Sequence, residues 1–191
     1  MTETLTLNQW QKRAHKLAWI TAGFALLIIV VGAMVTTTKA GDTNPGWSLA
    51  FWGWFATWLK SEGGRLWEDG HRIIATITGF CAMATAFCLW KGERNSPRRW
   101  LGLIAILTMF MQGVVGGLRV LVVSNAEFRD FMLELTGGGS NNESIRAVFA
   151  MFHGVIGQIT FVLLSILVLV TSRAWIAKPE SKPSVHGLAT R

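Results

Sequence analysis

Four long apolar segments, each bounded by polar or charged residues, dominate the pattern of this chain. They cover approximately residues 17–38, 71–90, 100–123 and 145–176. A helix needs about 20 apolar residues to cross the hydrocarbon core of a bilayer, and each segment reaches this length. The pattern therefore predicts an all-α, polytopic membrane protein built as a four-transmembrane-helix bundle.

The composition supports a membrane protein over a soluble one. Hydrophobic residues make up 51% of the 191 residues, and the chain has 10 tryptophans and no tyrosine. A soluble domain of this size needs a larger share of polar residues to cover its surface. We expect a membrane domain over residues 17–176, a cytoplasmic N-terminus over 1–16 and a cytoplasmic tail over 177–191. The first apolar segment is too long for a cleavable signal peptide, so we expect it to be retained.

Basic residues gather in the segments on one side of the predicted membrane. They are Lys12, Arg13, Lys16, Lys91, Arg94, Arg98, Arg99, Arg173, Lys178, Lys182 and Arg191, against the acids Glu3, Glu93 and Glu180. The positive-inside rule places this side and both termini in the cytoplasm, with outward loops at 39–70 and 124–144. A bacterial inner membrane fits best, with membrane lipid as a partner. This asymmetry also explains the pI of about 10.1, so no nucleic-acid partner is expected.

Aromatic and small residues suggest two further features. Trp47, Trp54 and Trp58 recur at helical intervals, which predicts a helix at the outer interface; a specific contact to heme or a quinone is the alternative. Small residues recur within three of the predicted helices, at Gly79, Gly113, Gly116, Gly117, Gly154 and Gly157. They permit close helix packing, or they make room for a flat macrocycle.

His71 and His153 are the candidate cofactor ligands. They are the only histidines within the predicted spans. The second and fourth helices run in the same direction, so the two side chains are expected at similar depth near the outer face. A single buried histidine is more often a hydrogen-bonded structural residue, but neutral imidazole is a good iron ligand and bundles build cofactor sites from facing helices. The pair predicts a heme held by His71 and His153.

Three charged residues are candidates for roles around such a heme. Glu68 precedes His71 by three residues and shares its helix face if the helix extends that far back. It could then stabilise positive charge or move a proton, or it could cap the helix. Arg72 and Arg119 could hold heme propionates, because a guanidinium binds a carboxylate in a bidentate way. Arg72 could instead extend to the membrane interface.

Five motifs in this order resemble the heme A synthase family. They are GAMVTTTKAG (32–41), PGW (45–47), EDGHR (68–72), QGVVGGLRV (112–120) and HGVIGQ (153–158). The resemblance implies an enzyme that oxidises the C8 methyl of heme O to the formyl group of heme A, for cytochrome c oxidase assembly. It implies Glu68 as the catalytic residue, His71 and His153 as the histidine pair, and heme b, heme O or heme A as the bound cofactor or substrate.

The chain resembles the N-terminal half of that family only. Typical members have eight spans in two similar halves, of which the C-terminal half carries a resident heme b and the N-terminal half is the expected substrate site. Many also carry a cysteine pair in the first outer loop, which residues 42–47 lack here. The resemblance thus implies a homodimer or a separately encoded second half. A non-catalytic bis-histidine heme protein for electron transfer or heme delivery is the alternative, and a structural subunit of a respiratory complex is the third reading.

Overall fold

Seven α-helices make up the part of the chain that the computed structural model describes, which is residues 6–38, 40, 51–136 and 142–177. They are α1 (Gln9–Thr37), α2 (Phe51–Trp58), α3 (Gly64–Gly92), α4 (Arg98–Ser124), α5 (Ala126–Leu135), α6 (Asn142–Thr171) and α7 (Arg173–Ile176). These described segments contain no strand, which confirms the predicted all-α class.

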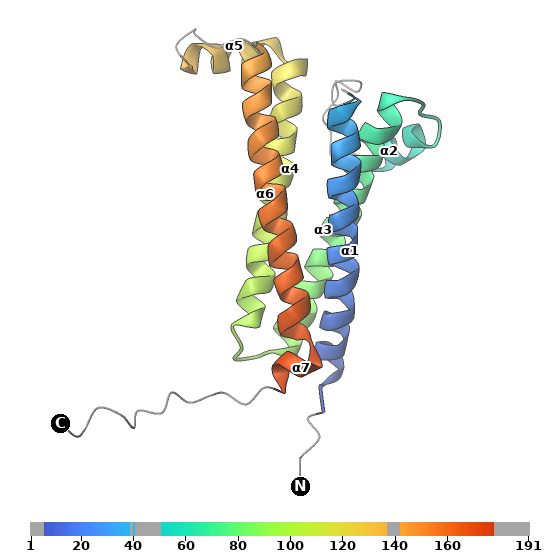
Figure 1. Cartoon of the computed structure of the whole chain (residues 1–191), viewed down its shortest axis with the longest axis vertical. Coiled ribbons are helices and arrows are strands. Elements are labelled where there is room, and N and C mark those ends of the chain that lie inside the picture. Colours follow the sequence, from blue (N-terminus) through green and yellow to red (C-terminus); the bar gives the residue numbers. More distant parts are fainter. Residues whose placement is uncertain (1–5, 39, 41–50, 137–141, 178–191) are drawn as a thin grey trace, which may run out of the picture.

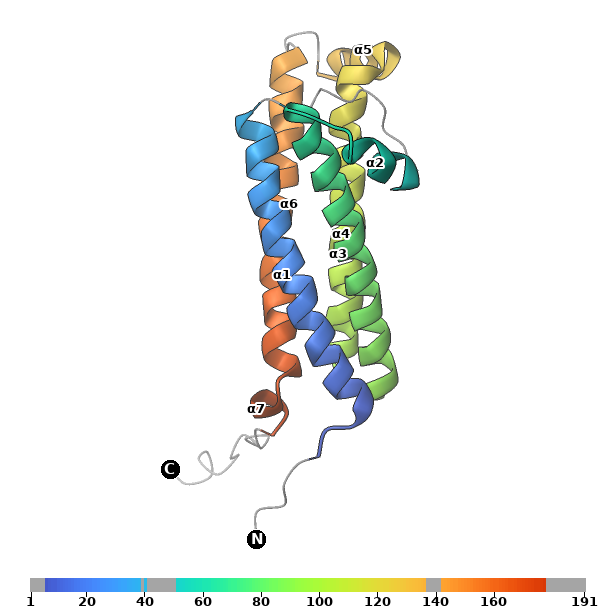
Figure 2. The same ribbon diagram turned by 90° about the vertical axis from the view of Figure 1, so that its right-hand side faces the viewer.

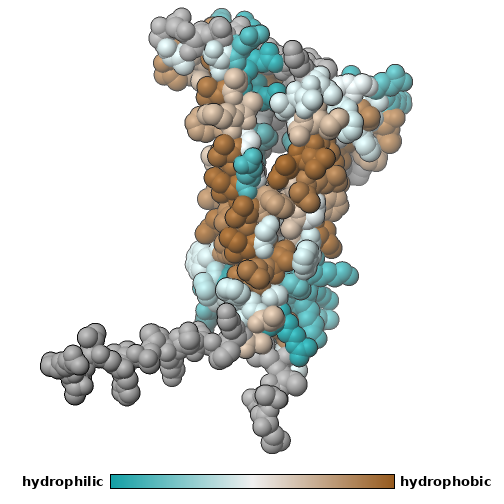
Figure 3. All heavy atoms as spheres, viewed as in Figure 1, coloured by the Kyte–Doolittle hydropathy of each residue, from teal (hydrophilic) through white to brown (hydrophobic). Residues whose placement is uncertain are grey.

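Helices α1, α3, α4 and α6 form the predicted four-helix bundle. Each is long and apolar enough to cross a membrane, so this is a multi-pass membrane protein. The helices alternate in direction, with α2 and α5 at one end and α7 at the other (Figure 1). We call these the α2/α5 end and the α7 end. Hydrophobic side chains cover the middle of the face in Figure 3, and hydrophilic ones gather toward the two ends, as expected for a bundle surrounded by lipid.

The helix ends differ from the predicted segments in three places. Helix α3 begins at Gly64, so it includes Glu68 and His71 in one continuous helix. The fourth apolar segment holds two helices, because the Ser172 side chain accepts a hydrogen bond from the Trp175 amide and starts α7. The expected outer loop 124–144 contains α5, whose first turn is capped by the Asn125 side chain.

The first outer loop is only partly described. Helix α2 contains two of the tryptophans that predicted an interfacial helix, whereas Trp47 lies outside the described residues. Helix α2 packs on α3, and the indole Nε1 of Trp58 lies 3.1 Å from the position that a Cβ on Gly70 would occupy. A glycine at this position therefore lets α2 approach the start of α3 closely.

The four long helices form a ring in which each packs on two neighbours. Helix α1 contacts α3 and α6, and α4 contacts α3 and α6. Helices α3 and α6 make no such contact in the described chain, so they lie diagonally across the bundle (Figures 1 and 2). A side chain from α3 meets one from α6 only across the centre of the ring.

The tightest apolar packing lies toward the α7 end. The buried cluster joins small residues of α1 to larger ones of α3 and α6, and consists of Ala14, Ala18, Ala22, Ala25, Cys88, Leu89, Ala105, Leu164 and Leu167. Alanines on α1 let its neighbours approach closely, as is usual for helices packed in lipid. The predicted site residues lie toward the α2/α5 end, where Gly32 and Gly116 adjoin the two imidazoles.

Candidate functional site

The histidine pair lies at the centre of the bundle in the half toward the α2/α5 end. The ring centres of His71 on α3 and His153 on α6 are 6.3 Å apart, and the ring planes make an angle of 69°. Because α3 and α6 are diagonal partners, the rings meet across the middle of the ring of helices. The structure thus brings together the two histidines that the sequence placed at similar depth.

Each imidazole lies against a glycine of a neighbouring helix. A Cβ on Gly32 of α1 would lie 3.1 Å from His71 Cε1, and a Cβ on Gly116 of α4 would lie 3.1 Å from His153 Cε1. Either methyl group would crowd the ring. The same arrangement therefore occurs twice, once in the α1–α3 pair and once in the α4–α6 pair.

Backbone groups lie beside both rings. The backbone of Ile28 adjoins His71 and that of Gln112 adjoins His153, in each case four residues before the glycine. Neither Nδ1 atom makes a hydrogen bond to the described residues, although both atoms are buried. An imidazole that donates one N–H to a backbone carbonyl leaves its other nitrogen for a metal.

Glu68 lies one helical turn before His71 and forms a buried ion pair. Its carboxylate accepts a hydrogen bond from the Arg72 guanidinium at 2.7 Å, with the two side chains 5% and 11% exposed. Helix α3 has no acidic residue in its first turn, so the capping interpretation of Glu68 is wrong. Arg72 pairs with this carboxylate, and its side chain is only 11% exposed.

Arg119 on α4 lies near the histidine pair, and no acid among the described residues pairs with its charge. Its charge acts on both imidazoles, and its Nε atom is buried with no hydrogen-bond partner in the described chain. The ion pairs found among the described residues do not include it. An ionisable group inside a membrane bundle is costly and usually functional. This guanidinium is suited to an anionic group that enters the same space.

Gln112 is a site residue that sequence reasoning missed as an individual residue. Its amide Nε2 donates to the His153 carbonyl oxygen at 3.0 Å, which ties α4 to α6 beside the ring. A Cβ on Gly157 would lie 2.8 Å from this Nε2, so Gly157 makes room for the amide. The sequence feature that could have indicated Gln112 is its position at the start of the glycine-containing segment 112–120.

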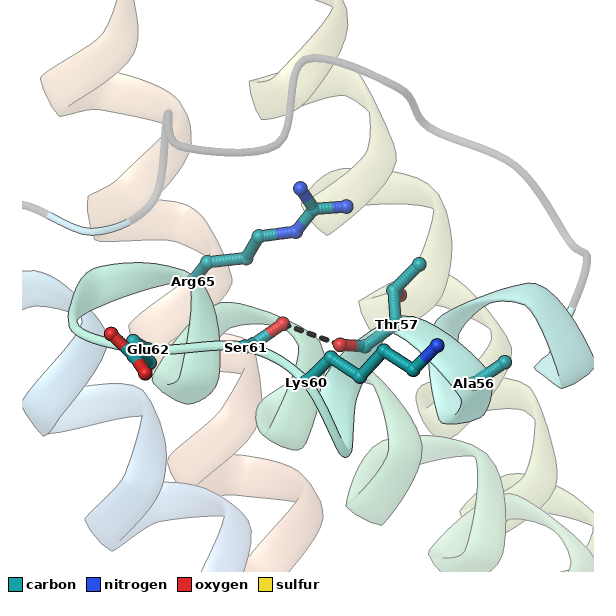
Figure 4. Close-up of a pocket in the computed structure, with 6 residues that line it drawn as sticks. All are labelled: Ala56, Thr57, Lys60, Ser61, Glu62 and Arg65. Atoms are coloured by element: carbon teal, nitrogen blue, oxygen red, sulfur yellow. Dashed lines mark hydrogen bonds between the residues drawn. The ribbon is translucent and has the colours of Figure 1, made fainter.

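The start of α3 is fixed by a second buried carboxylate. Asp69 is fully buried, lies 3.4 Å from Arg65 Nε, and accepts a hydrogen bond from the Thr57 hydroxyl at 3.5 Å. Figure 4 shows the α2–α3 connection, where the Ser61 hydroxyl donates to the Thr57 carbonyl at 2.8 Å beside a cavity of about 390 Å³. These contacts hold the first turns of α3, and with them Glu68 and His71.

These residues fit a heme. The imidazoles of His71 and His153, which meet across the bundle centre, could hold the iron of a heme. Arg119, which forms no ion pair among the described residues, suits a propionate, and Gly32 and Gly116 leave room beside the two rings. Within the described chain, the buried Nδ1 atoms of His71 and His153 have no hydrogen-bond partner. Buried polar atoms without a partner are unusual in a native interior.

The fold and the site define a multi-pass α-helical membrane protein with a histidine pair at the centre of its bundle. Over 107 residues the chain is 29% identical to heme A synthase from Shouchella clausii (strain KSM-K16), a match that covers 55% of this chain and 35% of that protein. This match supports a heme A synthase-like family relationship. The match spans about a third of the relative's length. No protein-family profile matches the chain, and no solved structure matches it.

Proposed function

We propose that this protein is a membrane oxidoreductase of the heme A synthase type, which binds heme through His71 and His153 and oxidises the C8 methyl of heme O to a formyl group. The observation that carries the proposal is the histidine pair, with ring centres 6.3 Å apart across the bundle centre and a glycine against each ring. The relationship to heme A synthase supports the choice of reaction.

The chain's own residues have distinct parts in this proposal. Bound heme supplies iron redox chemistry. His71 and His153 hold and orient the heme, and the Arg119 guanidinium donates hydrogen bonds to a propionate. Converting a methyl group into a formyl group is a four-electron oxidation. With water as the source of the oxygen atom it releases four electrons and four protons, so it needs an external electron acceptor and a group that takes up protons. Glu68 is the proposed proton acceptor, because it lies one turn from His71 in a buried part of α3.

The ion pair of Glu68 favours a second candidate function. A carboxylate that accepts a hydrogen bond from the Arg72 guanidinium at 2.7 Å can serve the packing of α3 alone. A bis-histidine heme protein for electron transfer or heme delivery needs the two histidines and no catalytic carboxylate. The two functions therefore differ in whether Glu68 acts on the substrate.

We also propose a location and an orientation. The α7 end carries Lys12, Lys91, Arg94 and Arg173, which favours the cytoplasmic side of a bacterial inner membrane. The histidine pair then lies nearer the outer face. Labelling of single cysteines, introduced at Lys12 and at Glu134 on α5, by a membrane-impermeant thiol reagent in intact cells tests this orientation. Reaction at residue 134 alone is expected, and reaction at residue 12 alone would reverse it.

Pigment analysis of the purified protein tests the function. Heme O together with heme A supports the oxidoreductase, heme b alone supports electron transfer, and absence of heme rejects both. His71→Ala and His153→Ala should each lower the heme content or change the low-spin absorption spectrum. His15→Ala is the control, because His15 bonds the Thr171 hydroxyl near the α7 end. Unchanged spectra in both site variants would reject the ligand assignment.

A further inference from the structure

A basic cavity lies at the α7 end, far along the bundle from the histidine pair. It has a volume of about 600 Å³, and its lining residues are Trp90, Lys91, Arg94, Asn95 and Arg99. They come from the end of α3, the connection to α4 and the first turn of α4. Three of the five are cations and none is an acid, so the cavity is suited to an anion.

The acid nearest in sequence does not neutralise these cations. Glu93 is 5% exposed and binds the Arg98 guanidinium at 2.5 Å and the Gln11 amide at 3.1 Å. Its charge is therefore already paired inside the protein. Among the described residues, Lys91, Arg94 and Arg99 take part in no ion pair. Three like charges around one cavity repel one another unless an anion lies between them.

Arg99 is held in place before any ligand binds. Its guanidinium lies 5.0 Å from the ring centre of Trp90 and 5.5 Å from that of Trp100, and its Nη1 donates to the Arg94 carbonyl. The two indoles contact each other edge to face at 5.8 Å. The Arg99 Nε is buried and has no partner in the described chain. The charge is thus oriented but not compensated, which lowers the entropy lost when an anion binds.

The position of the cavity indicates where the anion comes from. Trp90 and Trp100 are 46% and 54% exposed at the ends of two membrane-crossing helices, and tryptophans at such positions lie at headgroup depth. Exposed apolar side chains, including Phe87 on α3 and Leu103 and Leu107 on α4, continue from the cavity toward the membrane centre. A ligand with a negative head and an apolar tail contacts both parts.

We propose that this cavity binds the phosphate of an anionic glycerophospholipid, whose acyl chains lie along α3 and α4. Inorganic phosphate shares the headgroup chemistry but has no acyl chains to contact the exposed apolar side chains. Basic sites between helix ends are typical places for anionic headgroups. The proposal is independent of the heme chemistry, because it uses none of the residues around the histidine pair.

Native mass spectrometry of the full chain released from detergent tests the proposal. We expect phosphatidylglycerol to bind more tightly than phosphatidylcholine with the same acyl chains. The double variant Lys91→Gln/Arg94→Gln should weaken phosphatidylglycerol binding by about fivefold for each charge removed. The matched control is Lys12→Gln/Lys16→Gln, which removes two exposed charges at the same end that do not line the cavity.

Three results would overturn the lipid site. They are equal binding of the two lipids to the unaltered protein, an equal loss in the control variant, and displacement of phosphatidylglycerol by millimolar inorganic phosphate. The last result would assign the cavity to free phosphate. The comparison of the two lipids uses the unaltered protein, so it decides the question even if a variant fails to fold.

Discussion

Two glycines control how closely the histidine rings pack on the neighbouring helices. Gly32 in the α1–α3 pair and Gly116 in the α4–α6 pair occupy equivalent places. A Cβ added to either glycine would lie 3.1 Å from an imidazole carbon. The bundle therefore presents two similar half-sites to one central space. Other glycines on the same helices differ, because nothing lies within 4 Å of the Cβ positions of Gly23 on α1 and Gly113 on α4.

This difference gives a residue-scale prediction with matched controls. Gly116→Ala should displace the His153 ring and lower heme affinity on the order of tenfold, as expected for a change beside a metal ligand. Gly113→Ala on the same helix should leave heme binding unchanged, because nothing lies within 4 Å of its Cβ position. Heme titration followed by absorption spectroscopy measures both. Equal heme affinity in the two variants would show that the contact at Gly116 does not position the ring.

Glu68 supports a second residue-scale prediction. Glu68→Gln keeps the size and hydrogen bonding of the side chain but removes its charge. Heme should stay bound while conversion of heme O to heme A falls by roughly 100-fold, the usual loss for a missing acid–base group. The control is Glu134→Gln, an exposed acid on α5. Unaltered conversion by Glu68→Gln would leave the carboxylate with only its structural pairing to Arg72.

At the scale of elements, the connection between α3 and α4 is tied to the start of α1. The Asn8 side-chain oxygen caps α1 by accepting a hydrogen bond from the Gln11 backbone N–H at 2.9 Å. The Asn8 side-chain Nδ2 donates to the Gly92 carbonyl at 3.1 Å. Gln11 completes the capping box and also binds Glu93. Asn8 and Gln11 therefore join the beginning of α1 to the end of α3.

We predict that Asn8→Ala destabilises the bundle without changing the heme site. Loss of the cap and of the bond to Gly92 should cost about 1–2 kcal/mol and lower the Tm in detergent. Gln9→Ala, at the exposed first position of α1, is the control and should have little effect. Heme content per folded protein should be the same in both variants. A reduced heme content in Asn8→Ala alone would show that the two ends of the bundle are coupled.

At the scale of the whole molecule, we propose that two copies of the chain associate. Gly113 on α4 and Gly154 on α6 are exposed and have no atom within 4 Å of their Cβ positions, so both allow close approach of another helix. A two-fold interface needs only one kind of chain. Such a dimer would contain two histidine pairs, the number that the family resemblance implies for activity.

Mass measurement in nanodiscs checks this proposal. A particle with twice the 21.1 kDa chain mass is expected, and Gly154→Leu should shift it toward the monomer by blocking close approach. Gly23→Leu, at an equally open position on α1, should leave the mass unchanged. A monomer that converts heme O to heme A without a partner would refute the need for a second unit. A monomer that holds heme but converts none would favour the electron-transfer or delivery function.

The sequence by itself determined the four membrane-crossing helices, their alternating direction and the similar depth of His71 and His153. These features depend on the length and order of apolar segments, which are local properties of the chain. The sequence did not decide whether the second membrane helix begins before Glu68, because Glu68 and Asp69 are charged and the apolar segment starts only after them. Arginine partners, Arg72 for Glu68 and Arg65 for Asp69, allow α3 to begin at Gly64.

Only the tertiary structure decided which side chains meet inside the bundle. The sequence did not indicate that α3 and α6 are diagonal partners or that Gly32 and Gly116 face the imidazoles. It also did not indicate that Arg119 has no ion-pair partner within the described part of the chain. Such contacts depend on how each helix is rotated about its axis. In lipid, the outer face of a helix is as apolar as the inner face, so the hydrophobic pattern carries little information about that rotation. Packing between the helices sets it.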